Sequence, residues 1–152
     1  MKNKASFIDI RMGQHELRSE AFQILMKNLP QYARTLDRLS RNTGENAIQL
    51  ATLQDNRMSG VVLGGHLNSH ATYLNFFFVI PEFRQAGIGK ILHDEFESRV
   101  KQANRTRIEC DVYDERVAKW FQKQRYVESC SRINYEVLLK QYGKLAMLKQ
   151  LG

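Results

Sequence analysis

The feature that most constrains the fold is the segment 79–90, where an apolar run ends at a proline and a glycine-containing loop leads into a helical pattern. Pro81 has no N–H to give to a sheet ladder, so the strand before it has to stop there. Gly87 and Gly89 remove side chains where the chain turns into the helix, which lets backbone N–H groups approach an anion closely. Because the first N–H groups of a helix are unpaired and lie at the positive end of its dipole, this turn predicts a phosphate site.

Two other phosphate motifs fail on the same residues. A Walker loop needs a hydroxyl after Gly-Lys to hold magnesium, but Lys90 is followed by Ile91. A dinucleotide fingerprint needs a third glycine, and none follows at the required offset. The spacing therefore favours a pyrophosphate site without a metal ion over a nucleotide triphosphatase or an NAD enzyme. No metal-ligand spacing is visible, and we expect His66, His70 and His93 at the surface.

Hydrophobic periodicity places this turn inside a mixed pattern of strands and helices. An aromatic-rich run precedes the turn, an amphipathic helix follows it, and an alternating strand follows that helix, which implies a right-handed parallel crossover. The expected strands are 7–11, 47–53, 58–67, 71–80, 107–113 and 132–139, and the expected helices are 14–28, 31–42, 88–100 and 115–124. The tail 140–152 places leucines three residues apart among lysines, which predicts an amphipathic helix.

Length and composition bound the class of protein. The 152 residues fit one domain, 1–152, around one main core. The longest apolar run, 76–80, is far shorter than the ~20 residues of a membrane span, so we expect a cytoplasmic protein. The net charge of +7 indicates an anionic ligand without identifying it. Cys110 and Cys130 lack the spacing of a disulfide framework or a zinc site, which predicts buried thiols.

The run from Val79 to Leu92 resembles the pyrophosphate-binding motif of the GCN5-related N-acetyltransferase (GNAT) family, and the order of elements over residues 5–139 matches as well. The resemblance implies an acyl-coenzyme A-binding fold of the α/β (α+β) class, with a mixed central sheet of about six or seven strands flanked by about four helices. It also implies acetyl-coenzyme A as co-substrate, strand pairing with the pantetheine amides and a backbone donor near Val79 that polarises the thioester. The residues that would bind the coenzyme are Phe77, Phe78, Val79, Arg84, Gln85, Ala86, Gly87, Ile88, Gly89, Lys90, Asp114 and Phe121.

The segment 114–126 resembles the last conserved helix of the family and departs from it. Asp114 stands where the family commonly has Asn, and Phe121 stands where a Tyr often protonates the departing thiolate. A thiol with a pKa near ~8.5 is a tolerable leaving group, and general acid help is worth about a hundredfold. Tyr113, Cys110 or water is therefore a candidate substitute for the missing acid.

The attacking amine needs a base rather than an acid, because a lysine-like amine with a pKa of ~10.4 has to lose a proton. Family members often place Glu early on the strand before the turn, where Tyr73 and Asn75 stand here. Glu109 and Asp111 on the neighbouring strand are the remaining carboxylates near the expected cleft, either as bases or as solvated charges. The candidate catalytic residues are Tyr73, Glu109 and Tyr113.

Three functions compete on these residues. The first is direct transfer of an acetyl group to a primary amine on a small molecule, a peptide N-terminus or a protein lysine. The second is acyl-coenzyme A binding without transfer, because the usual Tyr and Glu are missing. The third, a nucleic-acid-binding module, is disfavoured because the aromatic run 76–78 is typical of buried core rather than a stacking platform. Family members often form homodimers, and the tail after Lys140 is a candidate for that contact.

Overall fold

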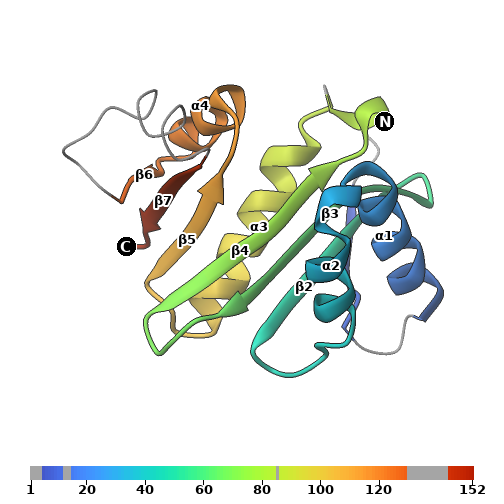
Figure 1. Ribbon diagram of the computed structural model, residues 1–152, viewed down its shortest axis with the longest axis horizontal. Helices are drawn as coiled ribbons and strands as arrows, with labels where there is room; N and C mark the ends of the chain where they lie inside the picture. The colour runs from blue at the N-terminus through green and yellow to red at the C-terminus, as the bar shows by residue number, and fades with distance from the viewer. Residues whose placement is uncertain (1–4, 12–14, 85, 130–143) are drawn as a thin grey trace.

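The computed structural model describes residues 5–11, 15–84, 86–129 and 144–152, which build a seven-stranded sheet with helices on both faces (Figure 1). The strands lie in the order β1-β2-β3-β4-β5-β7-β6. They are β1 (Ser6–Asp9), β2 (Ala47–Gln54), β3 (Arg57–His66), β4 (Ala71–Val79), β5 (Arg107–Val112), β6 (Val127–Glu128) and β7 (Leu145–Gln150). The described α-helices are α1 (His15–Asn28), α2 (Ala33–Ser40), α3 (Ile88–Gln102) and α4 (Glu115–Lys123). The mixed sheet and its helices confirm the predicted fold class.

Strands β1 to β4 form an antiparallel block. The turn between β2 and β3 has Asp55 and Asn56 at its centre, with φ of 51° and 63°. Positive φ at both central residues is the type I′ geometry, which matches the twist of the flanking strands. The predicted strands 47–53 and 58–67 therefore form a hairpin. On its other side, β3 pairs with β4.

Strand β4 carries a bulge at Asn75. The register against β3 passes from Phe76 opposite Leu63 to Leu74 opposite Gly64, so Asn75 has no partner across the ladder. A bulge reverses the alternation of side chains and bends the strand. Gly64 lies where a Cβ would come within 2.7 Å of the ring of Phe96, so the close packing of β3 under α3 requires glycine here.

Strands β4 and β5 are parallel, as the predicted crossover requires, but they pair over only three residues each. Ala71 to Tyr73 face Arg107 to Glu109, and the pairing then ends although β4 continues to Val79. In Figure 1 the two strands diverge from that point toward their carboxyl ends. Beyond Tyr73, the edge of β4 that faces β5 therefore has no strand partner in the part of the chain that the structure describes.

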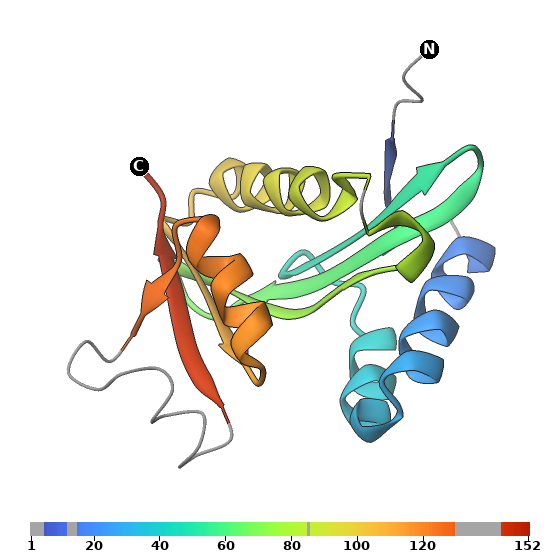
Figure 2. The same cartoon turned by 90° about the horizontal axis from the view of Figure 1, so that it is seen from above.

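Two apolar clusters hold the sheet between its helices. Helices α3 and α4 pack on one face, and α1 and α2 pack on the other, as Figure 2 shows for α3 against α1 and α2. The alternation of side chains along β4 divides its three phenylalanines between the two clusters, with Phe77 packed on the first and Phe76 and Phe78 on the second. No helix among the described residues is long and apolar enough to cross a membrane.

The carboxyl-terminal tail corrects one prediction. Residues 145–150 form strand β7 rather than an amphipathic helix, and β7 lies between β5 and β6. Leu145 and Met147 are buried while Ala146 between them is exposed, which is the period of a strand. The predicted strand 132–139 and Cys130 lie outside the described residues, whereas Cys110 is buried as predicted.

Candidate active site

The turn that connects β4 to α3 has the backbone conformation that the sequence predicts. The strand ends at Val79, and a short 3₁₀ turn over Pro81–Phe83 follows. Gly87 is the N-cap of α3 and has φ of 76°, in the left-handed region that L side chains rarely adopt. A Cβ at Gly87 would meet no atom within 4 Å, so the backbone angle rather than crowding requires glycine.

The first turn of α3 supplies the backbone donors for an anion. The N–H groups of Arg84 and Ala86 already donate to Pro81 and Phe83 within the turn, at 3.3 and 3.2 Å. Those of Ile88, Gly89 and Lys90 begin the helix, where no intrahelical acceptor exists and where no side chain caps the helix. The open donors of the first turn of α3 are therefore the last three residues of the predicted span, Ile88, Gly89 and Lys90.

The N-terminus of helix α4, unlike that of α3, is capped by a side chain. The Oδ1 atom of Asp114 accepts hydrogen bonds from the N–H groups of Arg116 and Val117, at 2.7 and 3.3 Å. A carboxylate in this position satisfies the helix N-terminus and complements its dipole. Asp114 therefore acts as a helix cap, which leaves α3 rather than α4 open to a phosphate.

The charged side chains of the turn are held by local contacts. Arg84 donates through Nε to the carbonyl of Val79 at 3.0 Å, and its guanidinium lies over the ring of Phe78. The ammonium of Lys90 pairs with Asp94 at 2.9 Å on the exposed side of α3. Both cations lie beside the turn and contribute positive potential. Gln85, the remaining predicted residue of the loop, lies outside the described residues.

A cleft of about 450 Å³ opens where β4 leaves β5. Its walls come from β4 and β5, from α4 and from the segment 29–35 around the start of α2, so residues from both faces of the sheet line it. A Cβ on Gly89 would lie 3.9 Å from the ring of Phe77, which also lines the cleft, so the turn and the cleft adjoin. The lining residues are Leu29, Gln31, Tyr32, Thr35, Tyr73, Leu74, Asn75, Phe76, Phe77, Cys110, Asp111, Val112, Tyr113, Asp114, Val117 and Phe121.

The polar centre of the cleft is a pair formed by Tyr73 and Asp111. The hydroxyl of Tyr73 donates to Oδ2 of Asp111 at 2.7 Å, across the gap between β4 and β5. Burial, and then the hydrogen bond to Asp111, raises the pKa of Tyr73 well above its ordinary value of 10. Tyr73 is therefore a hydrogen-bond donor at neutral pH, and Asp111 keeps its other oxygen for a ligand.

Of the other two predicted catalytic residues, Tyr113 lines the cleft and Glu109 does not. Tyr113 is 55% exposed at the cleft mouth, and burial together with the charge of Asp111 raises its pKa. Glu109 lines a neighbouring cavity rather than the cleft, and its carboxylate lies 3.8 Å from Arg107. Burial raises the pKa of Cys110 to about 12, so this thiol is a poorer acid than coenzyme A.

Phe121 and Phe77 form the inner wall of the cleft. Phe121 is buried, and its ring lies 6.4 Å from that of Phe77 and 5.1 Å from that of Trp120. Behind them His93 is fully buried, so its predicted surface position is wrong. Its Nε2 atom shares a hydrogen bond of 2.8 Å with the hydroxyl of Tyr126, a partner that the helical pattern alone does not reveal.

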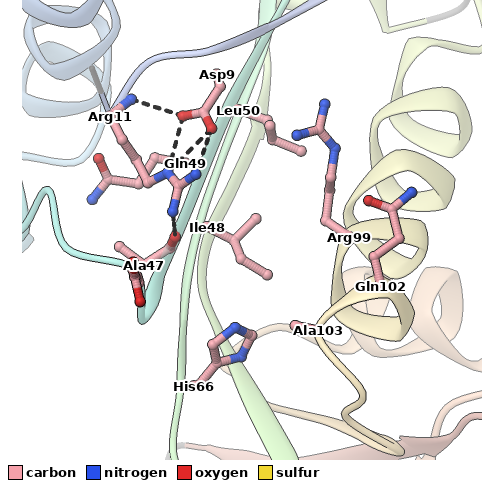
Figure 3. A pocket seen from close by; sticks show the side chains of 11 residues that line it. Asp9, Arg11, Ala47, Ile48, Gln49, Leu50, His66, Arg99, Gln102 and Ala103 are labelled. Carbon is pink, nitrogen blue, oxygen red and sulfur yellow. Dashed lines mark hydrogen bonds and ion pairs between the residues drawn. The ribbon is translucent and has the colours of Figure 1, made fainter.

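A second cavity, of about 260 Å³, lies between α3 and the strands β1 to β3 (Figure 3). Asp9 and Arg11 pair in it at 2.7 Å, and Arg99 pairs with Glu95 at 2.9 Å. Burial alone would raise the pKa of Asp9, but the hydrogen bonds and charge of Arg11 lower it on balance. His66 also lines this cavity. Arg99 lies about 17 Å along α3 from the first residue of that helix. This cavity is therefore remote from the turn that connects β4 to α3, which we call the phosphate turn.

Sequence reasoning missed three residues of the site. Tyr32 and Thr35 line the cleft, and Trp120 packs over the first turn of α3, where it lies 3.5 Å from a Cβ built on Gly89. Tyr32 and Thr35 lie within the predicted helix 31–42, but its pattern gave no reason to choose a ligand over the core. Only the fold of that segment across the end of β4 assigns these two side chains to the cleft.

The phosphate turn, the diverging strands and the cleft between them define the class of this protein as an acyltransferase. The chain belongs to the acetyltransferase (GNAT) family, whose sequence model matches residues 11–125. Among curated proteins, none matches the sequence significantly.

Solved structures share this fold at low sequence identity. Ard1 from Thermoplasma volcanium superposes with a TM-score of 0.74 at 15% identity, covering 97% of this chain and 98% of that one. GCN5 from Tetrahymena gives 0.70 at 17% identity, with 91% and 88% covered. An aminoglycoside 6'-N-acetyltransferase complexed with coenzyme A gives 0.74 at 14% identity, with 97% and 96% covered.

Proposed function

We propose that the chain transfers the acetyl group of acetyl-coenzyme A to a primary amine. The observation that carries this proposal is the adjacency of two features. The open N-terminus of α3 adjoins a cleft through Phe77, and the same cleft holds the Tyr73–Asp111 pair. The coenzyme A complex of the similar aminoglycoside acetyltransferase supports the choice of acyl carrier.

The coenzyme fits the backbone that lines this site. The N–H groups of Ile88, Gly89 and Lys90 hold the pyrophosphate without a metal ion. The edge of β4 from Leu74 to Val79, which β5 leaves unpaired, accepts the pantetheine amides as a further strand would. A backbone donor near Val79 then polarises the carbonyl oxygen of the thioester.

The residues of the cleft complete the chemistry. Asp111 accepts the proton that the amine loses, and Tyr73 positions Asp111 through its hydrogen bond. The thioester supplies an activated acyl carbon, so a C–N bond forms as the C–S bond breaks. Tyr113, at the mouth of the cleft, donates a hydrogen bond to the departing sulfur, and the thiolate then takes up a proton from water. Asp111 replaces Glu109 as the proposed base because Glu109 lies outside the cleft, beside Arg107.

Turnover tests the proposal directly. Purified protein with acetyl-coenzyme A and a panel of primary amines is expected to release free thiol and acetylated amine in equal amounts. Calorimetry on the same sample measures coenzyme binding. Binding without turnover on any amine would establish the acyl-coenzyme A-binding alternative, and absence of binding would overturn both. Binding to nucleic acid that collapses with added salt would then favour the third function.

Gly87 offers a matched pair of variants for the phosphate turn. Gly87→Asp and Gly87→Asn adopt positive φ at similar cost, but only the aspartate places a negative charge at the open helix end. Gly87→Asp is therefore expected to lose measurable binding of acetyl-coenzyme A in calorimetry, while Gly87→Asn retains binding within about tenfold. Full affinity in Gly87→Asp would show that the pyrophosphate binds elsewhere.

A further inference from the structure

The charged side chains that line the cleft are acidic, whereas the whole chain is basic. Among the described residues that line the cleft, the charged side chains are Asp111 and Asp114, both acidic, although the whole chain carries a net charge of +7. Asp114 uses one oxygen to cap α4. Asp111 receives the hydroxyl of Tyr73 on one oxygen and lies 3.9 Å from the exposed ammonium of Lys144 at the rim. A local excess of negative charge thus lies where the acceptor binds.

The neighbouring cavity extends this charge. It is lined by Glu109 and Asp111, and none of the described residues in its wall is a lysine or an arginine. Glu109 and Asp111 lie two residues apart on one strand, which separates them by about 6.6 Å on the same face of the sheet. Asp111 and Glu109 each have a long, partly exposed contact with a cation, Lys144 at 3.9 Å and Arg107 at 3.8 Å, and such contacts neutralise a charge only weakly. An anionic group that entered either cavity would therefore still face a carboxylate.

The opposite wall of the cleft is aromatic. The ring of Tyr32 lies 5.7 Å from Phe76 in an edge-to-face contact and 6.1 Å from Tyr113 in a tilted one. Tyr113 and Val117 remain largely exposed at the mouth, at 55% and 44%. Ring faces attract cations and bury flat apolar groups, so this wall matches an amine with an aromatic or apolar body.

We propose that the acceptor is a small cationic amine with an aromatic or apolar body and without a carboxylate. This inference rests on the proposed function, because it assigns the acceptor of that reaction. The ammonium group pairs with the remaining oxygen of Asp111 and displaces the loose contact with Lys144, which an exposed lysine gives up easily. The body of the amine lies against Tyr32 and Tyr113.

Two matched probes test the charge and the ring. Tyramine and tyrosine differ only in the carboxylate, and with saturating acetyl-coenzyme A we expect kcat/KM for tyramine to exceed that for tyrosine at least a hundredfold. Tyramine is also expected to exceed ethylamine at least tenfold, because ethylamine has no ring. Values for tyrosine within threefold of tyramine would overturn the inference while leaving acetyl transfer intact. Failure of every amine would instead count against the proposed function.

A binding measurement separates recognition from chemistry. Calorimetry of tyramine into the coenzyme A-bound protein is expected to show binding at least tenfold weaker in Asp111→Asn than in the unchanged chain. The control is Asp37→Asn, an exposed carboxylate on α2 that pairs with Arg41 outside the cleft. Affinity for coenzyme A should stay the same in both variants, which establishes that they fold. Equal tyramine affinity in Asp111→Asn would overturn the assignment of Asp111.

Discussion

His93 links the wall of the cleft to the core. Its ring is fully buried, lies 5.8 Å from Trp120 and 6.4 Å from Phe77, and shares a hydrogen bond with Tyr126. Its buried Nδ1 atom lies 3.7 Å from Oδ1 of Asp94, which is too far for a hydrogen bond. Burial and the charge of Lys149 lower the pKa of His93, against smaller opposing effects of Glu97 and Asp94. The folded protein therefore holds this imidazole neutral.

The buried imidazole predicts a pH dependence of stability. The pKa of His93 is below 6.5 in the folded chain and near 6.5 in the unfolded chain, so the unfolded chain binds more protons between these two values. The free energy of unfolding should fall as pH drops below 6.5, by at most about 1.4 kcal/mol per pH unit from this group. Urea unfolding between pH 7.5 and 5 measures it.

A neutral replacement isolates the contribution of this residue. His93→Gln keeps an amide near the hydroxyl of Tyr126 and does not titrate, so the loss of stability below pH 6.5 should be smaller than in the unchanged chain. His70→Gln, at an exposed position, should leave the loss unchanged. Identical pH profiles for His93→Gln and the unchanged chain would contradict the assigned neutral state.

At the scale of elements, β7 determines how the second half of the sheet closes. It pairs along its whole length with β5 and through its central residues, Met147 and Leu148, with β6. This places Leu145 and Met147 in the core beneath α4 and leaves Gln150 exposed. Because β7 fills the side of β5 that faces away from β4, it fixes β5 in the position from which β4 diverges.

The burial pattern of β7 predicts unequal costs of truncation. Met147→Ala should lower the free energy of unfolding by about 2–5 kcal/mol, because the side chain leaves a cavity in the core. Gln150→Ala, at the exposed end of the strand, should change it by less than about 0.5 kcal/mol. Urea unfolding at constant pH measures both. A helix with Leu145, Leu148 and Leu151 inward would leave Met147 at the surface, so a negligible cost for Met147→Ala would argue for the helix.

At the scale of the whole molecule, ligand binding to the folded state should appear as added stability. Acetyl-coenzyme A at a hundred times its dissociation constant adds about 2.7 kcal/mol, which raises the melting midpoint of a domain of this size by roughly five to ten degrees. S-acetylpantetheine lacks the phosphates that the α3 turn is proposed to hold. At the same concentration it should raise the midpoint by less than half as much. Equal shifts for the two compounds would remove the phosphate turn from the binding site.

The sequence by itself determined the local structural features of this protein, namely its turns and the helical pattern of α3. Pro81 cannot continue a sheet ladder and Gly87 can adopt positive φ without a steric cost, so the turn at 79–90 was predictable from its own residues. The hairpin at Asp55 and the amphipathic pattern of α3 were predictable for the same reason. Each depends on bond geometry or on a period along one segment, and needs no knowledge of distant partners.

Tertiary structure decided the site itself. The hydrogen bond between Tyr73 and Asp111 joins residues 38 positions apart. It depends on the parallel pairing of β4 with β5, which places Tyr73 opposite Glu109, two residues before Asp111. The burial of His93 and the strand at 145–150 likewise depend on which surface packs against them. Hydrophobic periodicity along one segment indicates which of its side chains face apolar neighbours. Which strands pair in a sheet depends instead on how all the strands of the chain compete for backbone partners.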